Sequence, residues 1–186
     1  MNLILAVTGA TGAHAAELLI EKSPWPVSLV ASRWGKEVFQ RECGPFDELA
    51  RRAETVYDDG DLSAPIASGS VPTAGMVVLP CSTNTLGKIA AGIADSLIPR
   101  AAHCHLKERR KLVLCVRESP WTLIDLDNAR TVAAAGGIIM PLSPPCYMVA
   151  GKSPRAVSLT DLLGAFVDRV LAVLGHPAGS DWESVS

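Results

Sequence analysis

Residues 82–85 read Ser-Thr-Asn-Thr and bring three hydroxyls and one amide together directly after an apolar run. A helix is expected to begin here, and the first N–H groups of a helix attract anions because they have no partner within the helix. An N-cap by Ser82 or Thr83 is the alternative explanation. Four consecutive polar side chains exceed what a single cap requires, so we favour a phosphate-binding turn.

The segment after the first apolar run has two glycines three residues apart. Gly9 and Gly12 lie within Thr-Gly-Ala-Thr-Gly-Ala, residues 8–13. Glycine allows the backbone to approach a phosphate or a flavin edge closely, and a following helix would favour an anion. A tight strand-to-helix turn needs the same glycines without any ligand, so both interpretations stay open. The spacing differs from the G-x-G-x-x-G of dinucleotide-binding proteins, which disfavours NAD.

Basic side chains recur at helical spacing in a later segment. Arg100, His103, Lys107 and Arg110 are separated by three, four and three residues, which predicts one face of one helix. A solvated basic face is the ordinary explanation. Residues 117–118, Arg-Glu, follow the next apolar run and add a further cation close to the expected site. We therefore favour a role for this face in binding phosphate.

The sequence predicts no metal site and a reducing compartment. His103 and His105 flank Cys104, but residues two apart on a helix point about 200° apart, so the two imidazoles cannot share an ion. The five cysteines include no C-x-x-C pair, and the first residues lack the basic region of a signal peptide. These features indicate reduced thiols and a cytoplasmic protein.

Five apolar runs alternate with helical patterns and form the framework that positions these polar segments. The runs are continuous in Val, Ile and Leu, which is typical of strands covered on both faces. Alternating strands and helices predict an α/β fold, a three-layer doubly wound parallel sheet of flavodoxin/Rossmann-like type, with ligands beyond the carboxyl ends of the strands. The expected strands are 3–8, 27–32, 76–80, 111–116 and 137–141. The first expected helix ends near residue 22, and the others span about 35–43, 84–94, 97–110, 122–135 and 158–174. Residues 57–75 are an expected loop.

Composition narrows the class of protein further. The 186 residues include 17 Lys and Arg against 19 Asp and Glu, a formal charge of −2, which disfavours a nucleic-acid partner. Hydrophobic residues make up 48% and mean hydropathy is +0.26, so a homo-oligomer is expected. No apolar run reaches the roughly 18 residues of a membrane span, so no membrane association is expected. Residues 1–175 are expected to form one domain, followed by a polar tail at 176–186.

Several segments together resemble the UbiX-type flavin prenyltransferases, a family long called aromatic-acid decarboxylases. The resemblance covers about residues 2–174, and its most specific string is LKERR followed by LVL and RESP. The matching segments are TGATGA (8–13), ASRWG (31–35), SGS (68–70), LPCSTNTLGKIAAGIAD (79–95), RAAHCHLKERRKLVLCVRESP (100–120), AAGGIIMPLSPPCY (134–147) and SLTDLLGAFVDRVL (158–171).

The resemblance implies an enzyme that joins a dimethylallyl group to reduced FMN. The donor is dimethylallyl monophosphate or diphosphate, and the new bonds go to flavin nitrogen 5 and carbon 6. The product, prenylated FMN, serves a separate UbiD-type decarboxylase. The family needs no metal and assembles as homo-oligomers, typically dodecamers, with the site at subunit contacts.

The resemblance also carries roles onto residues of this sequence. Those implied to bind FMN are Gly9, Ala10, Thr11, Ser32, Ser82, Thr83, Asn84, Thr85 and Arg117. Those implied to bind the prenyl donor are Arg100, Lys107, Tyr147 and Arg169. The implied catalytic residues are Glu42, Glu118, Lys107 and Tyr147.

The chain departs from the family pattern at the segment expected to cover the donor. Residues 146–149 read Cys-Tyr-Met-Val where the family has Phe-Tyr-His-x-Pro, and about six additional residues follow near 150–155. A non-catalytic carrier of FMN or prenylated FMN is therefore one alternative. A flavin-dependent cysteine decarboxylase is another, because PCSTNT has the Asn of the PASANT-like motif of such enzymes. Their catalytic His has no counterpart at the first helix except His14, and LKERR and Arg117-Glu118 disfavour this alternative.

Overall fold

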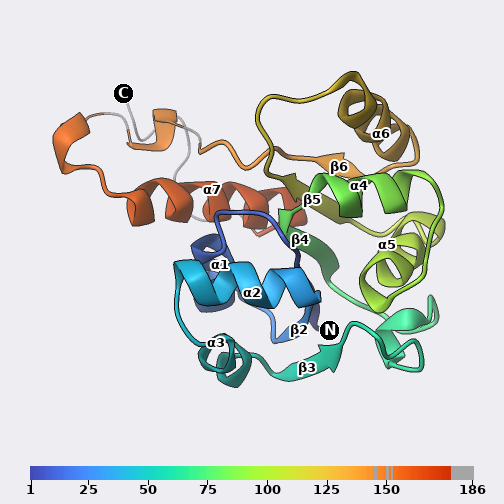
Figure 1. Cartoon of the computed structure of the whole chain (residues 1–186). Helices are drawn as coiled ribbons and strands as arrows, with labels where there is room; N and C mark the ends of the chain where they lie inside the picture. Colours follow the sequence, from blue (N-terminus) through green and yellow to red (C-terminus); the bar gives the residue numbers. More distant parts are fainter. Residues whose placement is uncertain (145, 150, 152, 177–186) are drawn as a thin grey trace.

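The strands of the chain form a single parallel sheet of six. A computed structural model describes residues 1–144, 146–149, 151 and 153–176, and its strand order is β3-β2-β1-β4-β5-β6 (Figure 1). This is the doubly wound order of Rossmann-type folds, so the predicted fold is confirmed. The strands are β1 (Leu3–Val7), β2 (Val27–Ala31), β3 (Thr55–Asp58), β4 (Gly75–Cys81), β5 (Leu112–Val116) and β6 (Ile138–Ile139).

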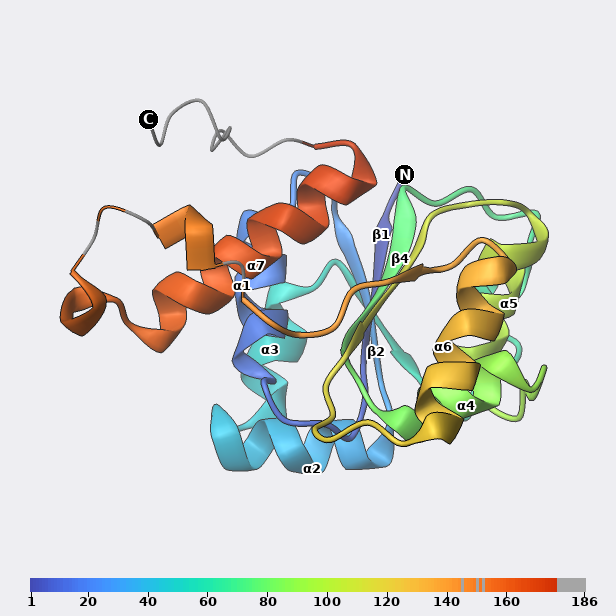
Figure 2. The same cartoon turned by 90° about the horizontal axis from the view of Figure 1, so that it is seen from above.

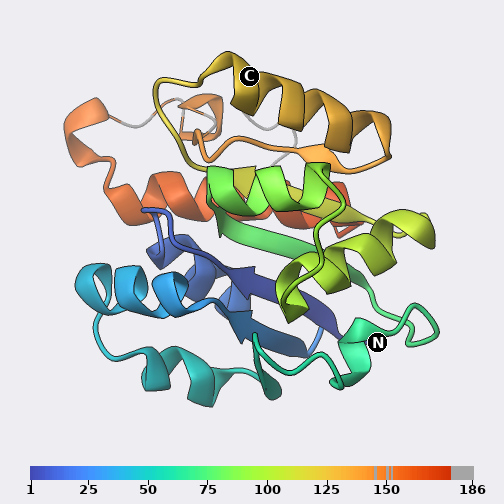
Figure 3. The same cartoon turned by 45° about the vertical axis from the view of Figure 1, so that its right-hand side comes forward.

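Two helical layers cover the sheet, as Figure 2 shows with the sheet seen edge-on. One layer contains α1 (His14–Lys22), α2 (Arg33–Glu42), α3 (Phe46–Arg52) and α7 (Leu159–Leu174). The other contains α4 (Thr83–Ala90), α5 (Leu97–Lys107) and α6 (Leu123–Ala134). Within these layers α1 packs against α7, and α4 lies beside α6 (Figure 3). Three short 3-10 turns complete the described elements: η1 (Pro65–Ala67), η2 (Cys146–Val149) and η3 (Pro154–Ala156).

Burial explains why the central strands read as continuous apolar runs. Every residue of β1, β2, β4 and β5 is buried, because each of these strands is covered on both faces. The cores on the two faces are separate, with Phe39 and Phe166 in the first and Met76 in the second. The sheet therefore holds the carboxyl ends of four strands in one row.

Strand β3, at one edge of the sheet, and helix α3 before it were missed by the sequence prediction. The residues of strand β3 alternate between exposed and partly buried. The strand has only four residues, too few to show a recognisable strand pattern in the sequence. Helix α3 follows a proline in a charged segment and buries Leu49 alone. The expected helix 97–110 ends at Lys107, because Arg109 adopts a left-handed conformation with φ of 55°.

The predicted segments near the C-terminus are described only in part. Of the polar tail at 176–186, only His176 is described, and residues 145, 150 and 152 of the segment before α7 also lie outside the described residues. Turn η3 and the first turns of α7 project beyond the rest of the molecule (Figures 1 and 2). Among the described helices, none has both the length and the apolar character needed to cross a membrane.

A close approach between α2 and β1 makes one glycine indispensable. A Cβ at Gly35 would lie 2.8 Å from the carbonyl carbon of Val7 and closer still to its oxygen. We expect Gly35→Ala to lower the free energy of unfolding by about 1–3 kcal/mol, measured by urea denaturation. Gly87→Ala in α4 is the matched control, because its Cβ would meet only an amide nitrogen at 3.4 Å. Equal stabilities of the two variants would contradict this packing.

Candidate active site at the carboxyl ends of the strands

A cavity of about 740 Å³ opens at the carboxyl ends of β1, β2, β4 and β5. Strands β1 and β4 are neighbours whose following helices cover opposite faces, so the cavity lies at the switch point where doubly wound sheets bind ligands. The lining residues are Gly9, Ala10, Thr11, Ser32, Trp34, Val38, Ser82, Thr83, Asn84, Thr85, Arg117, Glu118 and Ser119.

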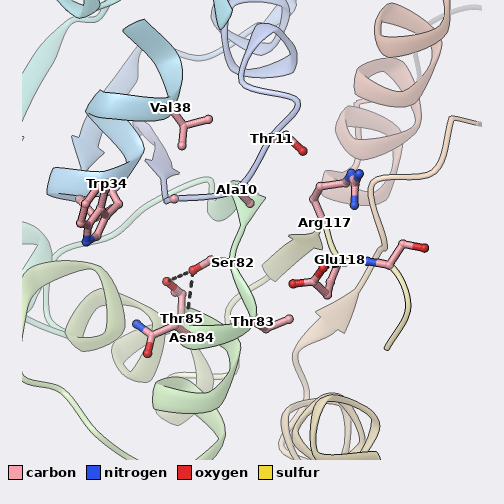
Figure 4. Close-up of a pocket in the computed structure, with 13 residues that line it drawn as sticks. Ala10, Thr11, Trp34, Val38, Ser82, Thr83, Asn84, Thr85, Arg117 and Glu118 are labelled. Atoms are coloured by element: carbon pink, nitrogen blue, oxygen red, sulfur yellow. Dashed lines mark hydrogen bonds between the residues drawn. The ribbon is translucent and has the colours of Figure 1, made fainter. Parts of the chain in front are cut away.

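All nine residues that the sequence assigns to FMN line this one cavity. Figure 4 shows Trp34 and Val38 of α2 on one side, and Arg117 and Glu118 on the other. The turn at the start of α4 lies between them. Trp34 was not predicted to line the site. The structure shows its side chain to be 63% exposed, and an exposed Trp beside a cavity is a recognisable signal of a binding surface.

The start of α4 combines a cap with free polar groups. The Ser82 hydroxyl accepts from the Thr85 N–H at 3.3 Å and shares a hydrogen bond of 3.0 Å with the Thr85 hydroxyl. The capping interpretation is therefore confirmed for Ser82. Over the described part of the chain, the side chains of Thr83 and Asn84 have no hydrogen-bond partner. The cap thus leaves two side chains and the first helical N–H groups open toward the cavity.

The two ligand-facing loops are joined at Thr8, through its backbone N–H, which donates to the Pro80 carbonyl at 3.2 Å, and through its buried hydroxyl. Thr8 Oγ1 donates to the carbonyl oxygen of Pro80 at 2.9 Å and accepts from the Ser82 N–H at 2.8 Å. Thr8 is only 1% exposed. It therefore fixes the end of β1, and the glycine turn after it, against the end of β4.

The glycine turn already has an anionic partner within the chain. Glu42 Oε2 accepts from the N–H groups of Gly12 at 2.9 Å and Ala13 at 2.7 Å. Gly12 has φ of +92°, a conformation that side chains rarely adopt, and this aims both N–H groups at the carboxylate. The start of α1 is thus occupied by Glu42, while the start of α4 is open to a ligand.

Arg117 is a cation whose guanidinium has no partner among the described residues. Its backbone N–H donates to Cys81 at 3.0 Å, which holds the residue at the end of β5. Within the described residues its guanidinium makes no ion pair or hydrogen bond, and Figure 4 shows it extending beside the cavity. An unpaired guanidinium at a strand end suits a phosphate or the polar edge of a flavin.

A second, more apolar cavity of about 470 Å³ shares Arg117 with the first. The sequence assigned Glu42 to catalysis, and the structure places it in this lining. The lining residues are Gly12, His14, Glu42, Arg117, Leu142, Pro144, Leu159 and Leu163. One guanidinium therefore borders both a polar and an apolar space.

Four residues assigned to the prenyl donor line neither cavity of this chain: Arg100, Lys107, Tyr147 and Arg169. Lys107 is at the end of α5, near the amino end of β5, whereas both cavities are lined by residues beyond the carboxyl ends. Tyr147 is 43% exposed in η2, and Arg169 lies on the exposed side of α7.

The basic face of α5 surrounds the loop after η1. The Arg100 Nε donates to the Ala67 carbonyl at 3.0 Å, and Lys107 pairs with Glu108. Arg110 lies beyond the helix and donates to the carbonyls of Gly69 and Val71. The prediction that Arg110 lies on the same helical face as the other basic residues is therefore wrong. The helix ends before Arg110, and the Arg110 guanidinium binds loop carbonyls.

Comparison with known proteins places the chain in a defined class. A family model described as flavoprotein matches residues 1–168. The chain is 43% identical to the flavin prenyltransferase UbiX of Deinococcus radiodurans over 94% of this chain and 88% of that protein. It is 40% identical to the flavin prenyltransferase UbiX of Thermoplasma acidophilum over 94% and 95%.

Solved structures agree with the sequence relatives. The chain resembles AnUbiX (PadA1) in complex with FMN and dimethylallyl pyrophosphate, with a TM-score of 0.86, 34% identity and 97% of each chain covered. It also resembles a dodecameric FMN-dependent UbiX-like decarboxylase from Escherichia coli O157:H7, with a TM-score of 0.87, 36% identity, and 98% and 99% covered. The cysteine decarboxylase TvaF, at 16% identity and a TM-score of 0.60, shares the fold alone.

The doubly wound sheet with its switch-point cavity, together with the family match, defines a flavoprotein. Within that class, the chain belongs to the UbiX-type flavin prenyltransferase family.

The bridge made by Thr8 can be tested directly. Thr8→Val keeps the shape but leaves the buried Ser82 N–H unpaired, while the Pro80 carbonyl keeps the bond from the Thr8 backbone N–H at 3.2 Å. We therefore expect the free energy of unfolding to fall by about 1–3 kcal/mol. Thr8→Ser retains both hydrogen bonds and is the control. Urea denaturation measures both, and a Val variant as stable as the Ser variant would contradict the bridge.

Proposed function

We propose that this protein transfers a dimethylallyl group from dimethylallyl phosphate to reduced FMN. The allylic carbon–oxygen bond breaks, phosphate leaves with the electron pair, and the carbon bonds to flavin nitrogen 5. Closure of a ring onto carbon 6 then gives prenylated FMN. The observation that carries the proposal is the unpaired Arg117 between a polar cavity and an apolar cavity, each lined by the residues described above.

The proposed roles for FMN follow from the polar cavity. The start of α4 would receive the flavin phosphate, because helix N–H groups and hydroxyls favour an anion, and the glycine turn would border the flavin. Arg117 would contact the flavin at its boundary with the donor. Relatives in this family support the choice of FMN, since AnUbiX is described as an FMN complex.

The apolar cavity suits the prenyl donor. An allylic cation forms in a dry, apolar environment, and the leucine side chains lining this space provide one. Closing the ring requires loss of a proton from carbon 6, for which Glu42, Glu118 or the released phosphate would be the base. Glu118 lines the polar cavity and Glu42 lines the apolar cavity, and Arg117 lines both.

A neighbouring subunit would supply the phosphate clamp. Arg100 and Lys107 line neither cavity of their own chain, so the proposal places them at the site of an adjacent copy. A lysine–arginine clamp stabilises the leaving phosphate without a metal. Exposed Leu123, Ile124 and Leu126 on α6 (74%, 72% and 52% exposed) support a homo-oligomer, proposed to be a dodecamer like the Escherichia coli relative.

The proposal keeps the remaining sequence assignments. Residues 1–175 would act as one flavin-binding domain, and Tyr147 and Arg169 would reach the donor within the assembly. A UbiD-type decarboxylase would receive the product in the cytoplasm, in keeping with the free state of all five cysteines.

A non-catalytic flavin carrier is the second candidate. The exposed Tyr147, which lines neither cavity, is the observation that favours it. A carrier would bind FMN and release it without any increase in mass.

Loss of the Lys107 ammonium separates flavin binding from transfer. We expect Lys107→Ala to bind FMN within about twofold of the unmodified protein but to form adduct at least about 100-fold more slowly, because leaving-group stabilisation is lost. Flavin fluorescence measures binding, and mass spectrometry measures the adduct. Unchanged adduct formation would remove Lys107 from the phosphate clamp.

Mixed oligomers test whether Lys107 acts across a subunit boundary. Subunits with Lys107→Ala and subunits with Arg117→Ala are each expected to be inactive alone. Refolded together, they should form some sites with both residues intact and regain part of the activity. No recovery in verified mixed oligomers would place both residues at the same subunit's site.

Arg117 is expected to contribute to FMN affinity. Arg117→Ala should raise the FMN dissociation constant about 10-fold or more, as expected for a lost charge-assisted hydrogen bond. Arg51→Ala, on the exposed surface of α3, removes the same charge elsewhere and should leave the constant unchanged. Equal constants for the two variants would contradict the role of Arg117.

A further inference from the structure

Three potential metal ligands of different types meet between α1 and α2. His14 and Glu17 lie in the first turn of α1, and Cys43 directly follows α2. One nitrogen, one carboxylate oxygen and the sulfur lie within 4.8 Å of one another. In a tetrahedral zinc site, with bonds of about 2.0–2.3 Å, the ligand atoms are about 3.3–3.8 Å apart. Small side-chain rotations would therefore bring these three atoms to bonding distance of one ion.

The existing contacts favour this arrangement. His14 Nδ1 lies 2.8 Å from Glu17 Oε2, while Nε2 lies 3.2 Å from the Thr160 hydroxyl on α7. A histidine that binds a metal through one nitrogen usually donates a hydrogen bond from the other, as Nε2 can do here. Arg52 is held by Glu21 at 2.8 Å and is 3.9 Å from the other oxygen of Glu17, so Arg52 leaves Oε2 to His14 and the ion.

We propose that His14 Nδ1, Glu17 Oε2 and Cys43 Sγ bind one divalent transition-metal ion of the zinc class, with water at the fourth position. The mixture of nitrogen, oxygen and sulfur excludes magnesium and calcium, which prefer oxygen ligands alone. The site is reachable from solvent, since the side chains of His14 and Glu17 are 35% and 17% exposed.

The ion would connect the two helices that frame the donor cavity. His14 lines that cavity beside Glu42, and Glu42 binds the N-terminal turn of α1. The metal takes no part in prenyl transfer, so this site does not depend on the proposed function. Its expected effect is on stability, because ligands from α1 and from the end of α2 are fixed together.

Metal binding should also release the thiol proton, because the thiolate is the form that binds a metal. Burial, followed by the negative charges of Glu17 and Glu42, raises the pKa of the free Cys43 thiol to about 12. Glu17 also has His14 and, on α3, Arg52 as neighbours.

Cobalt(II) titration of the full chain tests the site. We expect about one equivalent to produce a thiolate-to-cobalt charge-transfer band that zinc abolishes, and zinc to raise Tm. Cys43→Ser should lose the band, and Glu17→Gln, which preserves the size of the side chain, should bind at least about 100-fold more weakly. Cys146→Ser, at an exposed cysteine, is the matched control and should keep the band.

The outcomes are decisive because folding is checked separately by FMN binding. No band in the unmodified protein, or a band that survives in Cys43→Ser, would overturn the proposal. A failure of prenyl transfer with an intact cobalt band would contradict the proposed function and leave the metal site standing.

Discussion

The site depends on the close pairing of β1 and β4 at their carboxyl ends. These strands send their following helices to opposite faces of the sheet, so the loops after them separate and leave a space. The hydroxyl of Thr8 limits this separation, because it donates to the Pro80 carbonyl and accepts from the Ser82 N–H. A buried hydroxyl cannot exchange its protein hydrogen-bond partners for water. The two loops therefore keep a fixed spacing.

Charge is distributed unequally around the space that results. Glu42 satisfies the N–H groups at the start of α1, while the cap at the start of α4 leaves its neighbours free. Arg117 stands between the two cavities without a counter-ion in the described part of the chain. An anion therefore finds open N–H groups at the start of α4 and not at the start of α1. Under the proposed function, cations from a neighbouring subunit would stabilise the leaving phosphate of the second substrate.

Sequence reasoning predicted what depends on local patterns and missed what depends on tertiary contacts. The apolar runs predicted the central strands, and the polar turn at Ser82 predicted part of the cavity lining. Both signals lie within a few consecutive residues. Arg110 was misplaced because loop carbonyls, not helical spacing, decide where its guanidinium lies. The cluster around Cys43 has no sequence signature, since folding brings its members together across β2 and α2.

The most direct test of this account is the mass of the flavin that the unmodified protein releases. Purified protein would be incubated without air with reduced FMN and dimethylallyl monophosphate, and separately with the diphosphate. The account predicts a flavin heavier by one C5 unit with at least one donor. Bound FMN of unchanged mass with both donors, or no FMN binding at all, would contradict it.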